Sequence, residues 1–331
     1  MIEKDQILGE KVETEYKPQA NSGSLWRLAF HRLMRKRSSR IGLFILGVLI
    51  LVAVFAKQIS PHDPTKMLIW DEGVNRRIPP CIHLLGCEES EPQHIMGTDS
   101  RTRDYFSRIV YGTRSSLLVG ITSVGSAMII GTLLGAVAGY SGGWLNFSIM
   151  QVMDVLLAFP VLLLALVVIA LLGPGLENII IAIAIVQIPH FVRITRASVL
   201  ALKDTEYVKA SQALGGGYFH ILINRILPNI LTPLIIKGTL GIAAAIMDAA
   251  ALSFLGFGPN QDALEWGAMI GYERNSMFHA PHLVIFPGLA IVITVLAFNL
   301  LGDGLRDALD PRLAYSDVDK RTVELVNPKN E

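Results

Sequence analysis

Long apolar runs that contain no charged side chain constrain this chain more than any other feature. The clearest run from Ile41 to Ala56 and from Ser115 to Met153, and clusters of charged residues separate such runs. Only 17% of the 331 residues are charged, whereas an ordinary soluble domain has about 25%. An uncharged run of about 17–25 residues can cross the hydrocarbon core of a bilayer as a helix. The pattern predicts an all-α membrane protein and argues against a disordered chain or a soluble enzyme.

The apolar runs predict six transmembrane helices. The expected spans cover residues 41–57, 115–139, 145–172, 178–196, 230–255 and 283–302. A basic cluster between Arg27 and Arg40 precedes the first span, and Arg193 and Arg196 lie at the end of the fourth. Because basic residues favour the cytoplasmic side of a membrane, these segments and both termini are expected in the cytoplasm.

These spans divide the chain into five parts. We expect a basic cytoplasmic tail at 1–40, a membrane anchor helix at 41–57, an extracytoplasmic loop at 58–114, a five-helix core at 115–302 with a cytoplasmic loop at 197–229, and a cytoplasmic tail at 303–331. The first apolar run starts too late for a cleaved signal peptide, so a bacterial or archaeal plasma membrane is the expected location. The net charge of +1 gives no strong field that would attract a nucleic acid.

Three glycines in the second span predict a tightly packed helix. Gly131, Gly135 and Gly139 recur every four residues, so they lie on one face of a helix. Small residues on such a face let a neighbouring helix approach closely within a membrane. The spacing indicates a compact bundle and does not by itself indicate an activity.

The cytoplasmic loop carries the most specific pattern. It reads Glu206-Tyr-Val-Lys-Ala-Ser-Gln-Ala-Leu-Gly215, and Leu227-Pro228 follows after eleven residues. A short amphipathic helix with Tyr207, Val208, Ala210 and Leu214 on its apolar side, ending at a glycine, fits this stretch. Such a helix can dock in a groove of another protein and pass motion to the spans. An ordinary helical connection between two spans is the alternative.

This loop resembles the signature loop of binding-protein-dependent ABC importer permeases. In that family, the residues E-A-A are followed by three residues, a glycine, and nine further residues before I-x-L-P. Lys209-Ala210-Ser211 occupies the E-A-A positions here, and Gly215 and Leu227-Pro228 have the family spacing. The sequence departs from the family pattern at Lys209, Ser211 and Arg225.

Further motifs resemble the C-type permeases of dipeptide and oligopeptide transporters, over about residues 25–315. They are Gly97-Thr98-Asp99 with Arg103-Asp104, Ser107-Arg108, Tyr111-Gly112, Arg114-Ser115-Ser116-Leu117, Asp154-x-x-Leu157-Ala158-Phe159-Pro160, Leu252-Ser253-Phe254-Leu255-Gly256-Phe257-Gly258, and Asp307-Ala308-Leu309-Asp310-Pro311-Arg312. The family usually has a second glycine where this chain has Thr102.

The resemblance implies the type I ABC importer permease fold and a function as the permease subunit of an ATP-driven importer of di- or oligopeptides. It implies a second homologous permease, two ATP-binding subunits and an extracellular solute-binding protein as partners. The coupling residues would be Tyr207, Val208, Ala210, Ser211, Leu214, Gly215, Leu227 and Pro228. Relatives that carry nickel or other small solutes, a stand-alone secondary transporter and a membrane scaffold for signalling remain alternatives.

The residues themselves indicate no catalytic centre. The chain has no G-x-x-x-x-G-K-[S/T] phosphate-binding loop, so it is not expected to bind ATP through that motif. No cofactor and no catalytic residue are expected. The chain is therefore interpreted as a transport subunit rather than an enzyme in its own right.

Three charged residues are expected inside the membrane, where charges are costly. Asp154 lies in the third span, and Lys237 and Asp248 lie in the fifth. They could line a translocation path, but a structural role is favoured. Similar depth suggests that Asp154 and Lys237 form an interhelical pair.

The extracytoplasmic loop holds both cysteines, Cys81 and Cys87. An oxidising exterior favours a disulfide between them, and free thiols are the second possibility. A metal site with the nearby His83 and His94 ranks third, because the spacing matches no zinc pattern.

Overall fold

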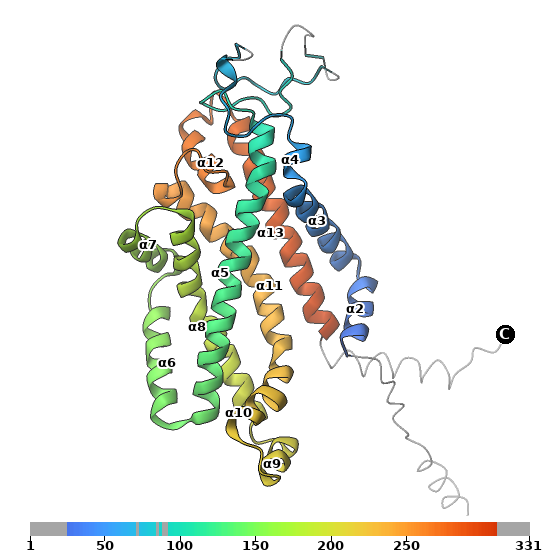
Figure 1. Ribbon diagram of the computed structural model, residues 1–331, viewed down its shortest axis with the longest axis vertical. Coiled ribbons are helices and arrows are strands. Elements are labelled where there is room, and N and C mark those ends of the chain that lie inside the picture. Colours follow the sequence, from blue (N-terminus) through green and yellow to red (C-terminus); the bar gives the residue numbers. More distant parts are fainter. Residues whose placement is uncertain (1–24, 71–72, 84–85, 88–91, 310–331) are drawn as a thin grey trace, which may run out of the picture.

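The computed structural model describes residues 25–309 apart from 71–72, 84–85 and 88–91 (Figure 1). Most of the two predicted tails, including the Asp310-Pro311-Arg312 motif, lies outside the described residues. Within the described residues, the regular secondary structure is helical, with isolated β-bridges in the loop before α5 (Tyr105–Ser141). This confirms the predicted all-α membrane architecture.

Twelve α-helices carry the labels used in Figure 1. In the described part of the chain they are α2 (Leu25–Arg35), α3 (Arg37–Val54), α4 (Ala56–Ile59), α5 (Tyr105–Ser141), α6 (Gly143–Leu157), α7 (Val161–Leu172), α8 (Leu176–Leu202), α9 (Glu206–Ala213), α10 (Tyr218–Ile221), α11 (Leu227–Leu252), α12 (Trp266–Glu273) and α13 (His282–Leu309). A π-helical turn, Leu222–Ile226, joins α10 to α11, and the helix runs on from Tyr218 to Phe257.

Five of these helices are long and apolar enough to cross a membrane. They are α3, α5, α8, the continuous helix Tyr218–Phe257, and α13. The pair α6 and α7 becomes a sixth span if the two helices are counted together. The described residues therefore contain five of the six predicted spans as single helices and the third as the bent pair α6 and α7.

The third predicted span differs from the expectation of one helix over 145–172. It consists of α6 and α7, whose axes are bent by 95°. The bend lies at Ala158–Pro160, between the two helices. Pro160 has no N–H to donate, and its ring disfavours a helical conformation at Phe159. The proline therefore ends α6 and begins α7 as its N-cap.

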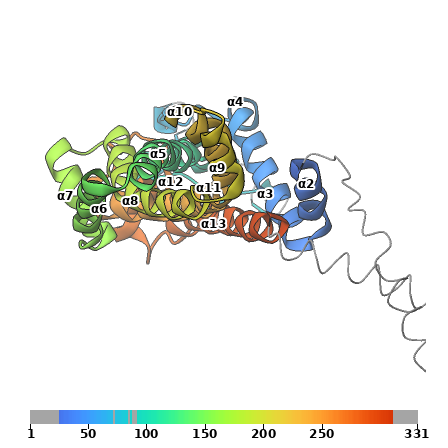
Figure 2. The ribbon, with the colours of Figure 1, turned by 90° about the horizontal axis from the view of Figure 1, so that it is seen from below.

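The glycine stripe of α5 packs against α8, as the spacing predicted. A Cβ atom on Gly131 would lie 2.5 Å from the Cβ of Phe191, and one on Gly135 would lie 2.6 Å from the carbonyl oxygen of Val192. A Cβ atom on Gly139 would lie 2.9 Å from the Cβ of Val199. Only a residue without a side chain allows this close approach of the two helices, which run side by side in both views (Figures 1 and 2).

The two ends of the bundle differ in construction. Figure 1 shows α9 and α10 at one end, and α12 with the described part of the long loop at the other. Neither α2 nor α12 was expected from the sequence. The long helix α5 begins ten residues before the predicted span at 115, so its first turns carry the polar residues of the predicted loop.

Candidate functional site

The helix α9 lies where the sequence predicted a short amphipathic helix. It ends in a Schellman motif: the N–H of Gly215 donates to the carbonyl of Gln212, and the N–H of Gly216 donates to the carbonyl of Ser211, both at 2.9 Å. Gly215 has φ +83°, a conformation that glycine adopts at little cost. This geometry explains why a glycine follows Leu214, which is the C-cap of α9.

The four residues of the predicted apolar side of α9 divide between two environments. Val208 is fully buried and belongs to the main hydrophobic core of the bundle. Tyr207, Ala210 and Leu214 are exposed, and Leu214 has 89% of its surface accessible. One side chain thus anchors α9 to the bundle, whereas the others present an apolar surface outward.

Hydrogen bonds connect α9 to two spans. The side-chain amide of Gln212 donates to the hydroxyl of Tyr140 on α5 at 3.4 Å. The side-chain amide of Asn229 on α11 donates to the hydroxyl of Tyr207, also at 3.4 Å. The rings of Tyr140 and Tyr218 pack edge to face with centroids 4.4 Å apart. Side-chain hydrogen bonds therefore attach α9 to both α5 and α11.

The other predicted coupling residues lie at the ends of these helices. Ser211 supplies a carbonyl to the Schellman motif, and Leu227 and Pro228 begin α11. A π-helical turn ends at Ile226, just before Leu227 and Pro228, and the N–H of Leu227 donates to the carbonyl of Leu222, five residues earlier. Pro228 has no N–H to donate, and the wider turn before it lets the helix continue without that hydrogen bond.

The intramembrane charges are arranged differently from the predicted pair. Asp154 on α6 accepts a 2.6 Å hydrogen bond from the guanidinium group of Arg193 on α8. The expected partner Lys237 does not contact Asp154. Among the described residues, neither Lys237 nor Asp248 forms a hydrogen bond or an ion pair; both are partly exposed on α11. These two residues remain candidates for the translocation path.

At the other end, a buried ion-pair network holds the start of α5. One carboxylate oxygen of Asp99 accepts hydrogen bonds from the backbone N–H groups of Arg101 and Arg103. The second oxygen accepts from the guanidinium of Arg103 at 2.7 Å. Arg108 donates to the backbone carbonyls of Pro64, Gln261 and Ala263. The network joins the long loop to the segment before α12.

The turn between Asp99 and Asp104 contains a residue in an unusual conformation. Thr102, which occupies the position of the family's second glycine, has φ +61° and is almost fully buried. A positive φ is costly for a β-branched residue. Its carbonyl accepts a hydrogen bond from the backbone N–H of Leu68 at 2.9 Å. The turn thus forms without the glycine, at the expense of backbone strain.

Asp104 caps the first turn of α5. Its Oδ2 atom accepts hydrogen bonds from the backbone N–H and the hydroxyl of Ser107, at 2.8 and 2.6 Å. Its Oδ1 atom lies 3.1 Å from Nδ1 of His94. Burial alone would raise the pKa of Asp104, but the hydrogen bonds with His94 and Ser107 outweigh it and lower that pKa.

A second buried carboxylate, Glu265, caps α12. It accepts hydrogen bonds from the backbone N–H groups of Gly267 and Ala268, each at 2.8 Å. Burial raises the pKa of Glu265, and the two hydrogen bonds offset part of this effect. The two cysteines also lie at this end, where a disulfide joins Cys81 to Cys87.

Sequence reasoning missed several residues that build this end of the bundle. His62 contacts the motif residue Ser107 and Asp262 pairs with Arg103, and Glu273 pairs with Arg77 at 3.2 Å. An aspartate followed three residues later by a serine is a local signal for a helix N-terminus and could have placed the start of α5 at Asp104. The contacts of His62 and Glu273 depend on tertiary structure, for which the sequence contains no local signal.

Comparison with known proteins agrees with this architecture. Residues 131–315 match the family model of the binding-protein-dependent transport system inner membrane component. Residues 24–80 match the N-terminal TM domain of oligopeptide transport permease C. In solved structures, the chain is similar to the MetNI methionine ABC transporter in an inward facing conformation, with a TM-score of 0.52, 20% identity and coverage of 62% of this chain and 97% of that one. This last similarity concerns the fold.

Curated relatives cover most of the chain. The dipeptide transport system permease protein DppC of Alkalihalophilus pseudofirmus is 43% identical over 290 residues, which is 88% of this chain and 91% of the relative. The glutathione transport system permease protein GsiD of Pectobacterium atrosepticum is 44% identical over 289 residues, 87% and 91% of the two chains. The di/tripeptide transport system permease protein DppC of Pseudomonas aeruginosa is 43% identical over 272 residues, 82% and 87% of the two chains.

These findings determine the class of the protein. Permeases of this family are inner membrane components that carry no ATP-binding site of their own and work with a separate ATPase and a substrate-binding protein. The predicted type I ABC importer permease fold is confirmed. The chain belongs to the binding-protein-dependent ABC importer permeases, in the oligopeptide permease C group.

Proposed function

We propose that this chain is the membrane-spanning permease subunit of an ATP-driven importer for di- or oligopeptides. The relatives that support the substrate class are named for dipeptides, di- and tripeptides, and glutathione. Glutathione is itself a tripeptide, so all three names point to short peptides. Nickel or another small solute is the alternative that the family resemblance left open.

The observation that carries the coupling role is the construction of α9. Leu214 and Tyr207 present exposed apolar surface at one end of the bundle, and Gln212 and Tyr207 are hydrogen-bonded to α5 and α11. A short helix that exposes apolar side chains and is attached to two spans is more stable when it docks in a groove of an ATPase subunit than when it is exposed to water. ATP can shift the bundle between inward-open and outward-open states only if the ATPase pair binds the two states with different affinity.

The proposed assembly contains a second homologous permease, two ATP-binding subunits and an extracellular solute-binding protein. The N-terminal tail, the loop 197–229 and the C-terminal tail would lie in the cytoplasm, and residues 58–114 would face the exterior of a bacterial or archaeal plasma membrane. This orientation is supported by the basic cluster between Arg27 and Arg40 and by Arg193 and Arg196 on α8.

Co-purification tests the proposal. The tagged chain is extracted in a mild detergent from its native membrane, and its partners are identified and counted by mass spectrometry. We expect two ATPase chains and a second six-span permease. Recovery of the chain alone, as a stable monomer or homodimer without an ATPase, would contradict the proposal and favour a stand-alone secondary transporter.

The substrate class is tested with the same complex in proteoliposomes. Uptake of a labelled dipeptide that depends on ATP and on the solute-binding protein supports the peptide assignment. ATP-dependent uptake of nickel ions with no uptake or competition by di-, tri- or tetrapeptides would overturn the substrate class while leaving the coupling role intact.

A further inference from the structure

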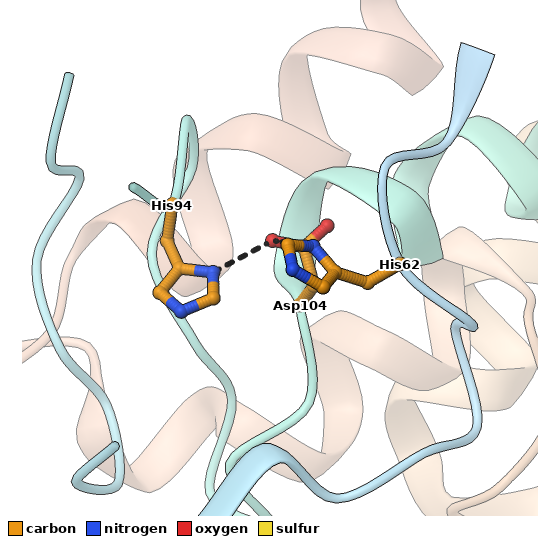
Figure 3. A group of neighbouring side chains, drawn as sticks. All are labelled: His62, His94 and Asp104. Atoms are coloured by element: carbon orange, nitrogen blue, oxygen red, sulfur yellow. Dashed lines mark hydrogen bonds and ion pairs between the residues drawn. The ribbon is translucent and has the colours of Figure 1, made fainter. Parts of the chain in front are cut away.

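Two histidines and an aspartate gather at the end of the bundle opposite to α9. They are His62, His94 and Asp104, shown in Figure 3. Each comes from a different segment: His62 follows α4, His94 lies in the long loop, and Asp104 is the N-cap of α5. One potential ligand atom from each residue lies within 4.8 Å of the other two. We propose that these three residues bind one divalent transition-metal ion, with Zn²⁺ as the best fit.

The spacing of the donor atoms suits a tetrahedral ion. Oδ1 of Asp104 lies 3.1 Å from Nδ1 of His94 and 3.9 Å from Nδ1 of His62. Zinc bonds to nitrogen and oxygen are about 2.0–2.2 Å long, so two ligands of a tetrahedral zinc lie about 3.3 Å apart. The observed distances lie on either side of this value. All three donor atoms lie within 4.8 Å of one another, so binding one ion requires only that the widest separations shorten.

Ser107 fixes the carboxylate in an orientation that suits metal binding. Its hydroxyl and backbone N–H both donate to Oδ2 of Asp104, which leaves Oδ1 directed toward the two histidines (Figure 3). The same hydroxyl accepts a hydrogen bond from the backbone N–H of His62 at 3.3 Å. Ser107 therefore holds two of the three ligands, as the outer partners of metal ligands commonly do.

The disulfide fixes the position of the third ligand. His94 forms a β-bridge with Cys81, whose backbone N–H donates to the His94 carbonyl at 2.8 Å. Because Cys81 is bonded to Cys87, neither cysteine offers a thiolate to a metal. The proposed ligand set therefore keeps His94 and differs from the cysteine and histidine site that the sequence analysis ranked third.

The donor set favours zinc among the common divalent ions. Imidazole nitrogens suit Zn²⁺, Ni²⁺ and Cu²⁺, whereas Ca²⁺ and Mg²⁺ prefer six or more oxygen ligands. Three protein ligands leave the fourth position for water, and the partly exposed side chain of His62 provides the route to solvent. His94 and Asp104 are almost fully buried. The bound ion would thus tie the long loop to the start of α5.

The test uses the full chain, purified with a tag that contains no histidine and stripped of metal with a chelator. Isothermal titration with ZnCl₂ should show one ion per chain, and zinc should raise the melting temperature. Addition of CoCl₂ should give the strong visible absorption of a four-coordinate Co²⁺ site. CaCl₂ should leave the melting temperature unchanged. Absence of stoichiometric zinc binding by the wild-type chain would overturn the proposal.

Matched variants separate this site from adventitious binding. His62→Ala should abolish zinc binding and the cobalt spectrum while the melting temperature without metal stays near that of the wild type, because His62 is partly exposed. His83→Ala, which changes another histidine of the same loop, should bind zinc like the wild type. Ser107→Ala should weaken zinc about 10–100-fold. Undiminished zinc binding in the His62→Ala variant would contradict the proposed ligand set.

Discussion

Arg193 on α8 and Asp154 on α6 form an ion pair with a 2.6 Å hydrogen bond. One helical turn further along α8, Arg196 donates to the side-chain carbonyl of Asn146 on α6, also at 2.6 Å. Two polar pairs therefore join α6 to α8 on the side that precedes the bend at Pro160. The side chains of Arg193 and Asp154 are each about half exposed at the surface of the bundle.

A charge exchange tests the Arg193–Asp154 pair. Asp154→Arg and Arg193→Asp should each lower the melting temperature in detergent, because each places like charges together. The double variant should recover most of the loss. The exchange of Asp154 with Lys237 serves as the control and should bring no recovery. Recovery in the Lys237 exchange, with none in the Arg193 exchange, would contradict the observed pairing.

The close contact of α5 and α8 predicts a strong effect of one methyl group. Gly135→Ala should destabilise the chain by about 1–3 kcal/mol, because the new Cβ would meet the backbone of Val192. Gly125→Ala on the same helix is the matched control, since no atom lies within 4 Å of its Cβ position. Thermal unfolding in detergent measures both. Equal melting temperatures for the two variants would contradict the packing.

Because the backbone is strained at Thr102, glycine should be more stable than alanine at this position, which reverses the order expected within a helix. Thr102→Gly should be about 1 kcal/mol more stable than Thr102→Ala, because only glycine adopts φ +61° without strain. At Thr122, within α5, the order should reverse, since glycine weakens a helix relative to alanine. Unfolding of the four variants checks the signs. A less stable glycine variant at Thr102 would show that the positive φ costs nothing.

The buried Glu265 predicts a pH dependence of stability. Its pKa is raised in the folded state, so its contribution is fully present below the pKa of the unfolded chain and is lost as the pH rises through the folded pKa. The wild-type melting temperature should therefore fall, relative to Glu265→Gln, as the pH rises from about 4 toward neutrality. Parallel profiles for the two proteins would refute the raised pKa.

The sequence predicted the features that depend on local chemistry. Uncharged runs located five of the six spans as single helices. The spacing of Gly131, Gly135 and Gly139 predicted that a neighbouring helix approaches α5 closely, and the structure shows that this helix is α8. The start of α5 was missed because Arg108 and Arg114 interrupt the uncharged run that predicted the span. In the structure the polar side chains of this segment form tertiary hydrogen bonds. Arg108, for example, donates to three backbone carbonyls.

Features that depend on the rotation of a helix could not be predicted. Depth along a span suggested Lys237 as the partner of Asp154, but depth does not say which face of α11 a residue occupies. The same limit applies to α9. The sequence predicted that its apolar residues share one side of the helix, but not which of them face the bundle. Val208 faces the core, whereas Leu214 faces outward, and only the placement of α9 against the bundle decides this division.

The central claim is that α9 passes ATPase motion to the spans, and Gly215 tests it most directly. Its φ of +83° is costly for a β-branched residue, so Gly215→Val should disrupt the end of α9. Gly217→Val is the control, because Gly217 has φ −69° and open space around its Cβ position.

The measurement is peptide transport per ATP hydrolysed, by the reconstituted complex in proteoliposomes. We predict that the Gly215→Val chain still inserts and assembles but transports at least about tenfold less peptide per ATP hydrolysed. Gly217→Val should resemble the wild type. Wild-type transport per ATP in the Gly215→Val complex would contradict the role of α9.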